Sequence, residues 1–148
     1  MPMLHVVEFV ATVAASLFAG AALYINLVEH PARMALDTRS AALEWAPSYK
    51  RATWMQAPLA LVSLISGIAA WLMGGGIAWS IAALLIGAVI PWTFLGIMPT
   101  NHLLLVPQRD LASSETRTLL GKWAKLHAVR TGLSLFATGL YIWQMAGS

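Results

Sequence analysis

Histidine, arginine and amide side chains occur in this chain at spacings that would bring them together for acid–base chemistry. Trp123, His127 and Arg130 are spaced i, i+4 and i+7, so a helix places all three on one face. A neutral imidazole is a general base near neutral pH, and a guanidinium stabilises an oxyanion. His30 and Asn101 occupy comparable places near the ends of two other apolar stretches. The residue types favour a neutral histidine as general base, with Arg130 or Arg33 as the group that stabilises an oxyanion.

The same region contains the donors of a metal site. Three imidazoles and a carboxylate are a ligand set that holds iron, copper or zinc and leaves a coordination position open. The candidate ligands are His30, His127, His102 and Glu29. The tight His-x-x-x-His spacing of many metal helices is missing, so the sequence leaves open whether iron, copper or no metal is bound.

Four long apolar stretches must position these groups. They cover residues 6–28, 54–73, 77–98 and 126–145, and about 20 residues is the length that crosses a bilayer as a helix. Hydrophobic residues make up 59% of the chain and charged residues 10%, against about 25% charged in a soluble domain. We therefore predict an all-α integral membrane four-helix bundle in which residues 1–148 form a single transmembrane domain.

Charge sets the predicted orientation. The nine Lys and Arg residues are absent from the Gly74–Gly76 connection and from both tails. The positive-inside rule then places segments 29–53 and 99–125 in the cytoplasm and both termini outside, in the inner membrane. The basic residues are explained by orientation and by anionic lipid, so no nucleic-acid partner is predicted. With no cysteine in the chain, thiolate nucleophiles and Cys-ligated metals are excluded.

Prolines predict how the first cytoplasmic segment folds. Pro31 disfavours helical geometry at His30, so the first helix should break there, and Pro31 should open a new helix. Residues 32–45 are partly amphipathic and predict a short helix on the membrane interface. Pro47 should end it.

Turn and cap signals predict the rest of the chain. Gly74–Gly76 closes a tight antiparallel connection between the second and third stretches. Pro91 should kink the third helix. Ser113 or Ser114 can cap a last helix whose first turn holds Glu115 and which runs on to residue 145. That last helix would extend beyond the membrane into the cytoplasm.

Each of the four apolar stretches is predicted to place polar residues at the same depth in the membrane. Asn26 and Glu29 share a helical face with His30, and Gln56 lies in the first turns of the second stretch. Burying such groups in lipid costs several kcal/mol unless they pair, which favours a common site at the cytoplasmic end. The alternative is that each one reaches from a helix end to the headgroups, as Trp and long charged side chains do.

Three motifs in order along the chain resemble the anthrone oxygenase-like family of small four-helix membrane proteins. Its fungal members oxidise anthrones to anthraquinones with dioxygen. The resemblance implies a comparable fold and the carry-over of His30, Asn101, His127 and Arg130 as functional positions. The motifs are Glu29-His30-Pro31-x-Arg33, Pro99-Thr100-Asn101-x-x-Leu104 and Trp123-x-x-x-His127-x-x-Arg130.

The leading hypothesis is a membrane-embedded oxidoreductase, a monooxygenase acting on a hydrophobic aromatic or phenolic substrate that enters from the lipid bilayer. His127 or His30 would remove an acidic C–H proton, and Arg130 with Asn101 would hold the enolate oxygen. A non-catalytic protein that binds or transports a small solute or metal ion is the alternative. A structural subunit remains a third reading, in which small-residue faces assemble a homo-oligomer.

Overall fold

The computed structural model of the chain describes residues 2–147, which are almost entirely helical. Short π-helical turns, labelled η, interrupt three of the long helices. In chain order the elements are α1 (Pro2–Tyr24), η1 (Ile25–Glu29), α2 (His30–Met34), α3 (Thr38–Ala70), η2 (Trp71–Gly75), α4 (Ile77–Gly87), α5 (Val89–Trp92), η3 (Thr93–Ile97), α6 (Met98–Leu104) and α7 (Ser114–Ala146). The all-helical prediction is confirmed.

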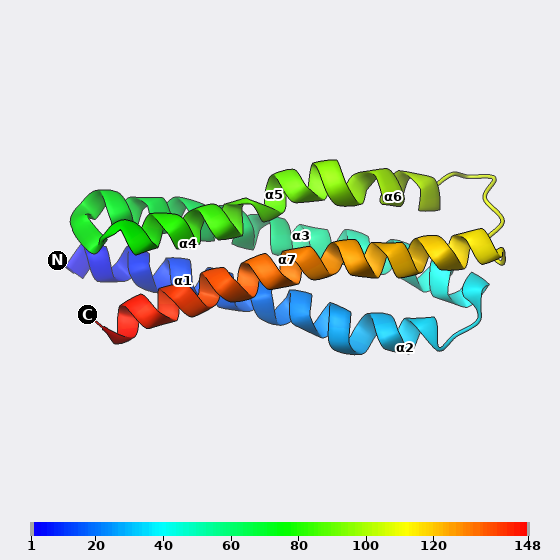
Figure 1. The fold of residues 1–148 in the computed structure, drawn as a ribbon, viewed down its shortest axis with the longest axis horizontal. Coiled ribbons are helices and arrows are strands. Elements are labelled where there is room, and N and C mark those ends of the chain that lie inside the picture. The colour runs from blue at the N-terminus through cyan, green and yellow to red at the C-terminus, as the bar shows by residue number, and fades with distance from the viewer. Residues whose placement is uncertain (1, 148) are drawn as a thin grey trace.

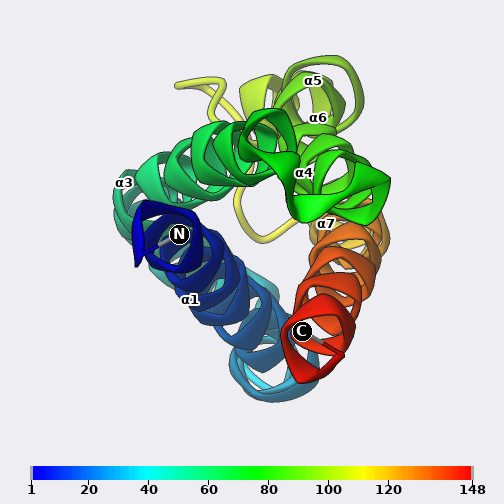
Figure 2. The same cartoon turned by 90° about the vertical axis from the view of Figure 1, so that its left-hand side faces the viewer.

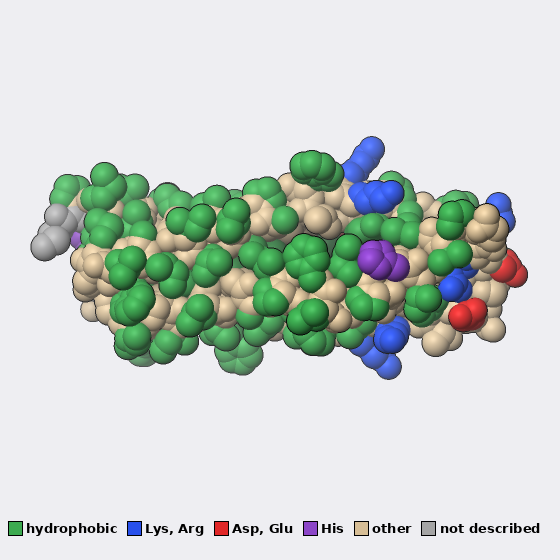
Figure 3. Space-filling view, turned by 90° about the horizontal axis from the view of Figure 1, so that it is seen from above, with side chains coloured by type: hydrophobic (Ala, Val, Ile, Leu, Met, Phe, Trp, Pro, Cys, Tyr) green, Lys and Arg blue, Asp and Glu red, His purple; other side chains and the backbone are tan. Residues whose placement is uncertain are grey.

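The described helices form long rods that lie side by side. The first rod covers residues 2–34, and the next ones cover 38–75, 77–104 and 114–146. Helix α1 packs against α3 and α7, and α4 packs against the same two helices. Seen from the end that holds both termini, the four therefore surround a common axis (Figure 2). The turn at 35–37 and the segment 105–113 lie at the opposite end (Figure 1). Charged side chains gather toward that opposite end, while apolar side chains cover the remainder (Figure 3).

Three helical segments in the described part of the chain are long and apolar enough to cross a membrane: Pro2–Met34, Thr38–Gly75 and Ile77–Leu104. The chain is therefore a membrane protein. Helix α7 is not among them, because it carries His127, Arg130 and other polar residues. Those polar side chains are buried against the other rods, whereas apolar residues of α7 face outward. A fourth span over 126–145 stays a prediction.

The predicted break at His30 and the interfacial helix over 32–45 are wrong. The first rod continues through Pro31 to Met34, because the π-helical turn before it uses a wider bond from His30 N–H to Ile25 O. The chain turns only at 35–37. Asp37 then caps α3, its carboxylate accepting from Ser40 N at 3.0 Å, and this hydrogen bonding lowers the pKa of the exposed Asp37 carboxyl.

Helix α3 also runs through Pro47, which was predicted to end a helix, and through Pro58. Each proline removes only one backbone bond, and α3 packs along α1 over this length. Most of the predicted 29–53 segment is consequently helical. The 99–125 segment is likewise mostly helical, since only residues 105–113 separate α6 from α7.

The remaining turn and cap predictions are confirmed. Gly74 and Gly76 have φ of +93° and +99° and close the connection between α3 and α4. Helix α4 ends at Gly87, four residues before Pro91, where the proline ring would meet a helical carbonyl. Ser113 caps α7, its hydroxyl accepting from Thr116 N at 3.1 Å.

Gly67 of α3 packs closely against α4 and α7. A Cβ there would collide with Tyr141 Oη and lie 2.9 Å from Ala83 Cβ. We expect Gly67→Ala to destabilise the fold by about 1–3 kcal/mol, because both neighbours are buried and must move. Thermal unfolding in detergent measures this. Gly139→Ala on α7, where nothing lies within 4 Å, is the matched control, and equal melting temperatures would contradict the close packing.

Candidate functional site

The polar residues predicted to form a site are buried inside the helical bundle. His30, Asn101, His127 and Arg130 are each no more than 9% exposed. They come from α2, α6 and α7, elements far apart in the chain. His102, one residue after Asn101, is exposed instead.

A cavity of about 390 Å³ lies between α3, η3, α6 and α7. Its walls combine apolar side chains with three of the predicted catalytic residues, while His30 is outside its lining. It is lined by Ile25, Ser48, Tyr49, Lys50, Ala52, Thr53, Trp54, Gln56, Thr93, Phe94, Ile97, Met98, Asn101, Trp123, His127 and Arg130. We call this space the α3–α7 cavity.

His127 is held in the wall of the α3–α7 cavity by two neighbours. Its Nδ1 lies 2.7 Å from Asn26 Oδ1, which comes from the π-helical turn η1. Its ring stacks on Trp123 with centroids 4.9 Å apart and an interplanar angle of 29°. The two contacts fix both the position and the tilt of the imidazole.

Arg130 is held beside His127 by the amide of Gln56. Arg130 Nη2 donates to Gln56 Oε1 at 2.8 Å, and the guanidinium lies over the Phe18 ring at 5.2 Å. Arg130 Nε, Gln56 Nε2 and Trp123 Nε1 are buried donors without a partner among residues 2–147, and Asn101 Oδ1 is a buried acceptor without one. Buried polar atoms are nearly always paired, so four such atoms around one cavity fit a polar ligand.

His30 belongs to a separate network around Arg33. Arg33 is 3% exposed and donates to His30 Nδ1 at 2.8 Å and to Glu29 Oε1 at 2.6 Å. Ser48 and Glu44 are its other partners. Because a guanidinium can only donate, His30 Nδ1 is the acceptor in this pair and is not free to take a substrate proton.

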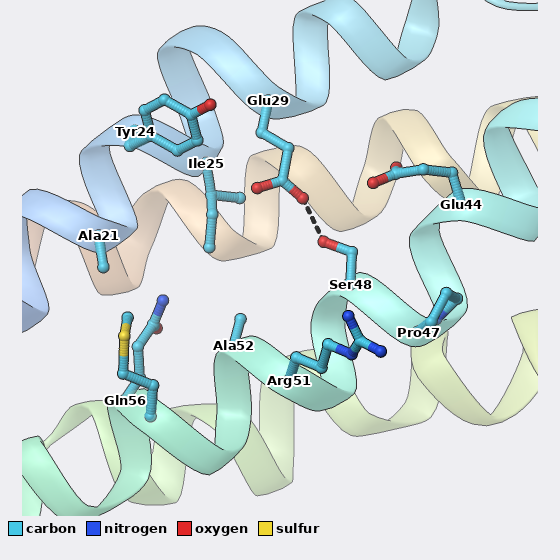
Figure 4. Close-up of a pocket in the computed structure, with 11 residues that line it drawn as sticks. Ala21, Tyr24, Ile25, Glu29, Glu44, Pro47, Ser48, Arg51, Ala52 and Gln56 are labelled. Carbon is cyan, nitrogen blue, oxygen red and sulfur yellow. Dashed lines mark hydrogen bonds between the residues drawn. The ribbon is translucent and has the colours of Figure 1, made fainter.

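Glu29 faces the protein, a point that the sequence left open. It binds Arg33 and also accepts from the Ser48 hydroxyl across a second cavity (Figure 4). That cavity has a volume of about 590 Å³ and lies between the first rod and α3. It shares Ile25, Ser48, Ala52 and Gln56 with the α3–α7 cavity, so the two lie back to back.

The predicted metal ligands are not brought together. His102 is exposed, and Glu29 and His30 are occupied by Arg33. Across residues 2–147 no group of three or more His, Cys, Asp or Glu side chains is arranged to hold a metal ion. The set His30, His127, His102 and Glu29 therefore does not fit a metal centre, and the prediction of a metal site there is not supported.

The fold and the α3–α7 cavity define a helical membrane protein with a buried polar site under apolar walls. Comparison with protein families narrows this class: the chain belongs to the anthrone oxygenase family, whose model matches residues 45–140. The matched range includes Gln56, Asn101, His127 and Arg130 but not Asn26 or His30.

A relative with an assigned activity is anthrone oxygenase tpcL of Aspergillus fumigatus, 36% identical over 75 residues. The match covers 49% of this chain and 47% of the relative, so the chain spans about half the length of the curated protein it matches. No solved structure matches the chain.

Sequence reasoning placed Asn26, Gln56 and Trp123 at the depth of the site without giving them a role in it. The structure joins Asn26 to His127, Gln56 to Arg130 and Trp123 to the His127 ring. The signal in the sequence was the position of Asn26 and Gln56, two polar amides inside apolar stretches. Such a residue needs a partner in lipid, although the sequence alone does not identify the partner.

Proposed function

We propose that this chain is a membrane-embedded monooxygenase that oxidises a hydrophobic aromatic or phenolic substrate with dioxygen in the α3–α7 cavity. One observation carries the proposal. The lining of a largely apolar cavity includes an imidazole, a guanidinium and four buried polar atoms that have no partner among the described residues. Ligand sites of small molecules combine apolar walls and a few polar groups in this way. Family membership supports the choice of oxygenation.

The substrate enters from the bilayer. Trp54 and Phe94 line the α3–α7 cavity yet are 84% and 65% exposed, so they form its outer rim between α3 and η3. An aromatic molecule dissolved in lipid meets two aromatic rings at this rim before it reaches Asn101 and Arg130. Ring–ring contacts of this kind are worth about 0.5–1.5 kcal/mol beyond the burial of area.

His127 is the base in this proposal. It removes an acidic C–H proton next to a carbonyl, and the resulting enolate oxygen is held by Arg130 Nε and Gln56 Nε2, two donors without a partner among the described residues. Asn101 Oδ1 accepts a hydrogen bond from a phenolic hydroxyl group of the substrate. His30, the other base considered from sequence, is bound to Arg33 and lies outside the cavity lining.

Dioxygen is the oxidant. The carbanion form of the enolate adds to dioxygen, and the peroxide loses water to leave a new carbonyl. For anthrone the balance is C14H10O + O2 → C14H8O2 + H2O, so one oxygen atom enters the product and the other leaves as water. All four electrons that reduce dioxygen come from the two C–H bonds of one substrate methylene group, whose carbon becomes the new carbonyl carbon.

The orientation proposed for the membrane follows from charge. The end that holds the turn 35–37 and the segment 105–113 carries the basic residues and faces the cytoplasm of an inner membrane, with both termini outside. The lipid bilayer and the substrate are the partners proposed, with no nucleic acid. Small-residue faces leave room for a homo-oligomer.

The test is oxygen consumption by the purified protein in lipid nanodiscs with anthrone under ¹⁸O-labelled dioxygen. We expect one labelled atom in each anthraquinone formed and a rate well above that of empty nanodiscs, which report spontaneous oxidation. A rate equal to that of empty nanodiscs would contradict the proposal. If the protein bound anthrone or a metal ion stoichiometrically without oxidising anthrone, the non-catalytic binding or transport alternative would replace the proposal.

A further inference from the structure

The amide of Asn26 makes three hydrogen bonds, all of them to residues of α7. Asn26 Nδ2 lies 3.1 Å from the carbonyl oxygen of Ala124. Asn26 Oδ1 lies 2.7 Å from His127 Nδ1 and 2.6 Å from Thr131 Oγ1. The residue reaches α7 from η1, about a hundred positions earlier in the chain, and it lies outside the range matched by the family model.

These contacts determine which end of the amide faces His127. A carbonyl oxygen can only accept, so the NH2 group of Asn26 must face Ala124. The amide oxygen is then the atom that faces the histidine. In a reversed amide the Asn26 oxygen would face the Ala124 carbonyl oxygen, and this hydrogen bond would be lost.

The orientation of the amide fixes the tautomer of His127. An amide oxygen accepts, so the Nδ1 atom facing it must carry the hydrogen of the neutral ring. The lone pair is then left on Nε2, for which no hydrogen bond to another described residue occurs. His127 lines the α3–α7 cavity, so this lone pair is available to a ligand there.

We infer that Asn26 is a positioning residue, which holds His127 in the Nδ1–H tautomer and presents Nε2 to the cavity as the proton acceptor. Thr131 assists by donating a second hydrogen bond to the Asn26 oxygen. The role in turnover rests on the proposed function, but the tautomer does not. A buried outer partner of this kind commonly sets the tautomer and direction of a functional histidine.

The tautomer is measured directly by NMR on protein labelled with ¹⁵N-histidine in detergent micelles. Long-range ¹H–¹⁵N correlations show which ring nitrogen carries the hydrogen, and the His127 signals are assigned by their loss in His127→Gln. We expect Nδ1–H in the parent protein. In Asn26→Leu, which has similar volume but no acceptor, we expect a mixture of the two tautomers. Asn101→Leu, another buried asparagine with no bond to His127, should leave the Nδ1–H form unchanged.

Two results would overturn the inference: hydrogen on Nε2 in the parent protein, or Nδ1–H retained in Asn26→Leu. The parent spectrum decides the first point even if Asn26→Leu fails to fold. Asn26→Asp keeps an acceptor oxygen and should keep Nδ1–H, so loss of that form there would also count against the assignment.

Turnover gives a second readout. In Asn26→Leu we expect kcat for anthrone to fall about 10- to 100-fold with KM unchanged, because the base is misdirected while the substrate contacts remain. Asn26→Asp should recover most of kcat. An Asn26→Leu variant with altered KM alone would contradict a positioning role. If no form of the protein oxidises anthrone, the proposed function fails while the tautomer result still stands or falls by the NMR spectrum.

Discussion

His127→Gln should lower kcat for anthrone oxidation about 10²- to 10⁴-fold, the range expected when a general base is removed. Glutamine keeps a polar group of similar length that can contact Asn26, while the ring that stacks on Trp123 is removed. What is lost is the nitrogen that takes the proton. Rates of oxygen consumption in nanodiscs, corrected for spontaneous oxidation, measure the effect.

His102→Gln is the matched control. His102 is exposed and outside the lining of the α3–α7 cavity, so this variant should oxidise anthrone at the parental rate. The comparison also separates the proposed base from the ligand set considered at first, which included both histidines. Equal decreases in kcat in His127→Gln and His102→Gln would contradict the role of His127 as the base.

Arg130→Met should lower kcat/KM about 10²- to 10³-fold, as expected on removing a donor to a developing oxyanion. Methionine keeps much of the volume of the side chain, while the charge and the free Nε donor disappear. Gln56 loses its partner as well, because its Oε1 accepts from Arg130 Nη2 at 2.8 Å. Steady-state kinetics with thermal unfolding alongside will separate catalysis from stability.

Two further variants test this result: Arg130→Lys as a partial rescue and Arg39→Met as a control. Lysine restores the charge without the planar set of donors, so we expect a partial recovery of kcat/KM. Arg39 is an exposed arginine on α3, away from both cavities, and Arg39→Met should retain parental kinetics. A parental rate in Arg130→Met would rule out the guanidinium as the group that holds the oxyanion.

Much of the fold follows from local signals in the sequence. The apolar stretches, the glycine turn near Gly76, the interruption before Pro91 and the Ser113 cap were all predictable, because each depends on neighbouring residues alone. Pro31 and Pro47 were misread for the opposite reason. Both sit in rods that pack along their neighbours, and a π-helical turn or one missing bond costs less than losing that packing.

The candidate site was predictable only in part. The i, i+4, i+7 spacing correctly placed Trp123, His127 and Arg130 on one buried face of α7. The partners of these residues depend on how the rods pack. The order of residues does not reveal that Asn26 contacts His127. It also does not reveal that His30 binds Arg33 instead of lining the cavity. Such pairings are decided by tertiary contacts between distant elements.

The most direct test of the central claim is a crystal structure of the protein in lipid mesophase with bound anthraquinone. Our account predicts the rings inside the α3–α7 cavity, between the Trp54 and Phe94 rim and His127, with one carbonyl oxygen within hydrogen-bond distance of Arg130. A ligand bound between the first rod and α3, or outside both cavities, would contradict it.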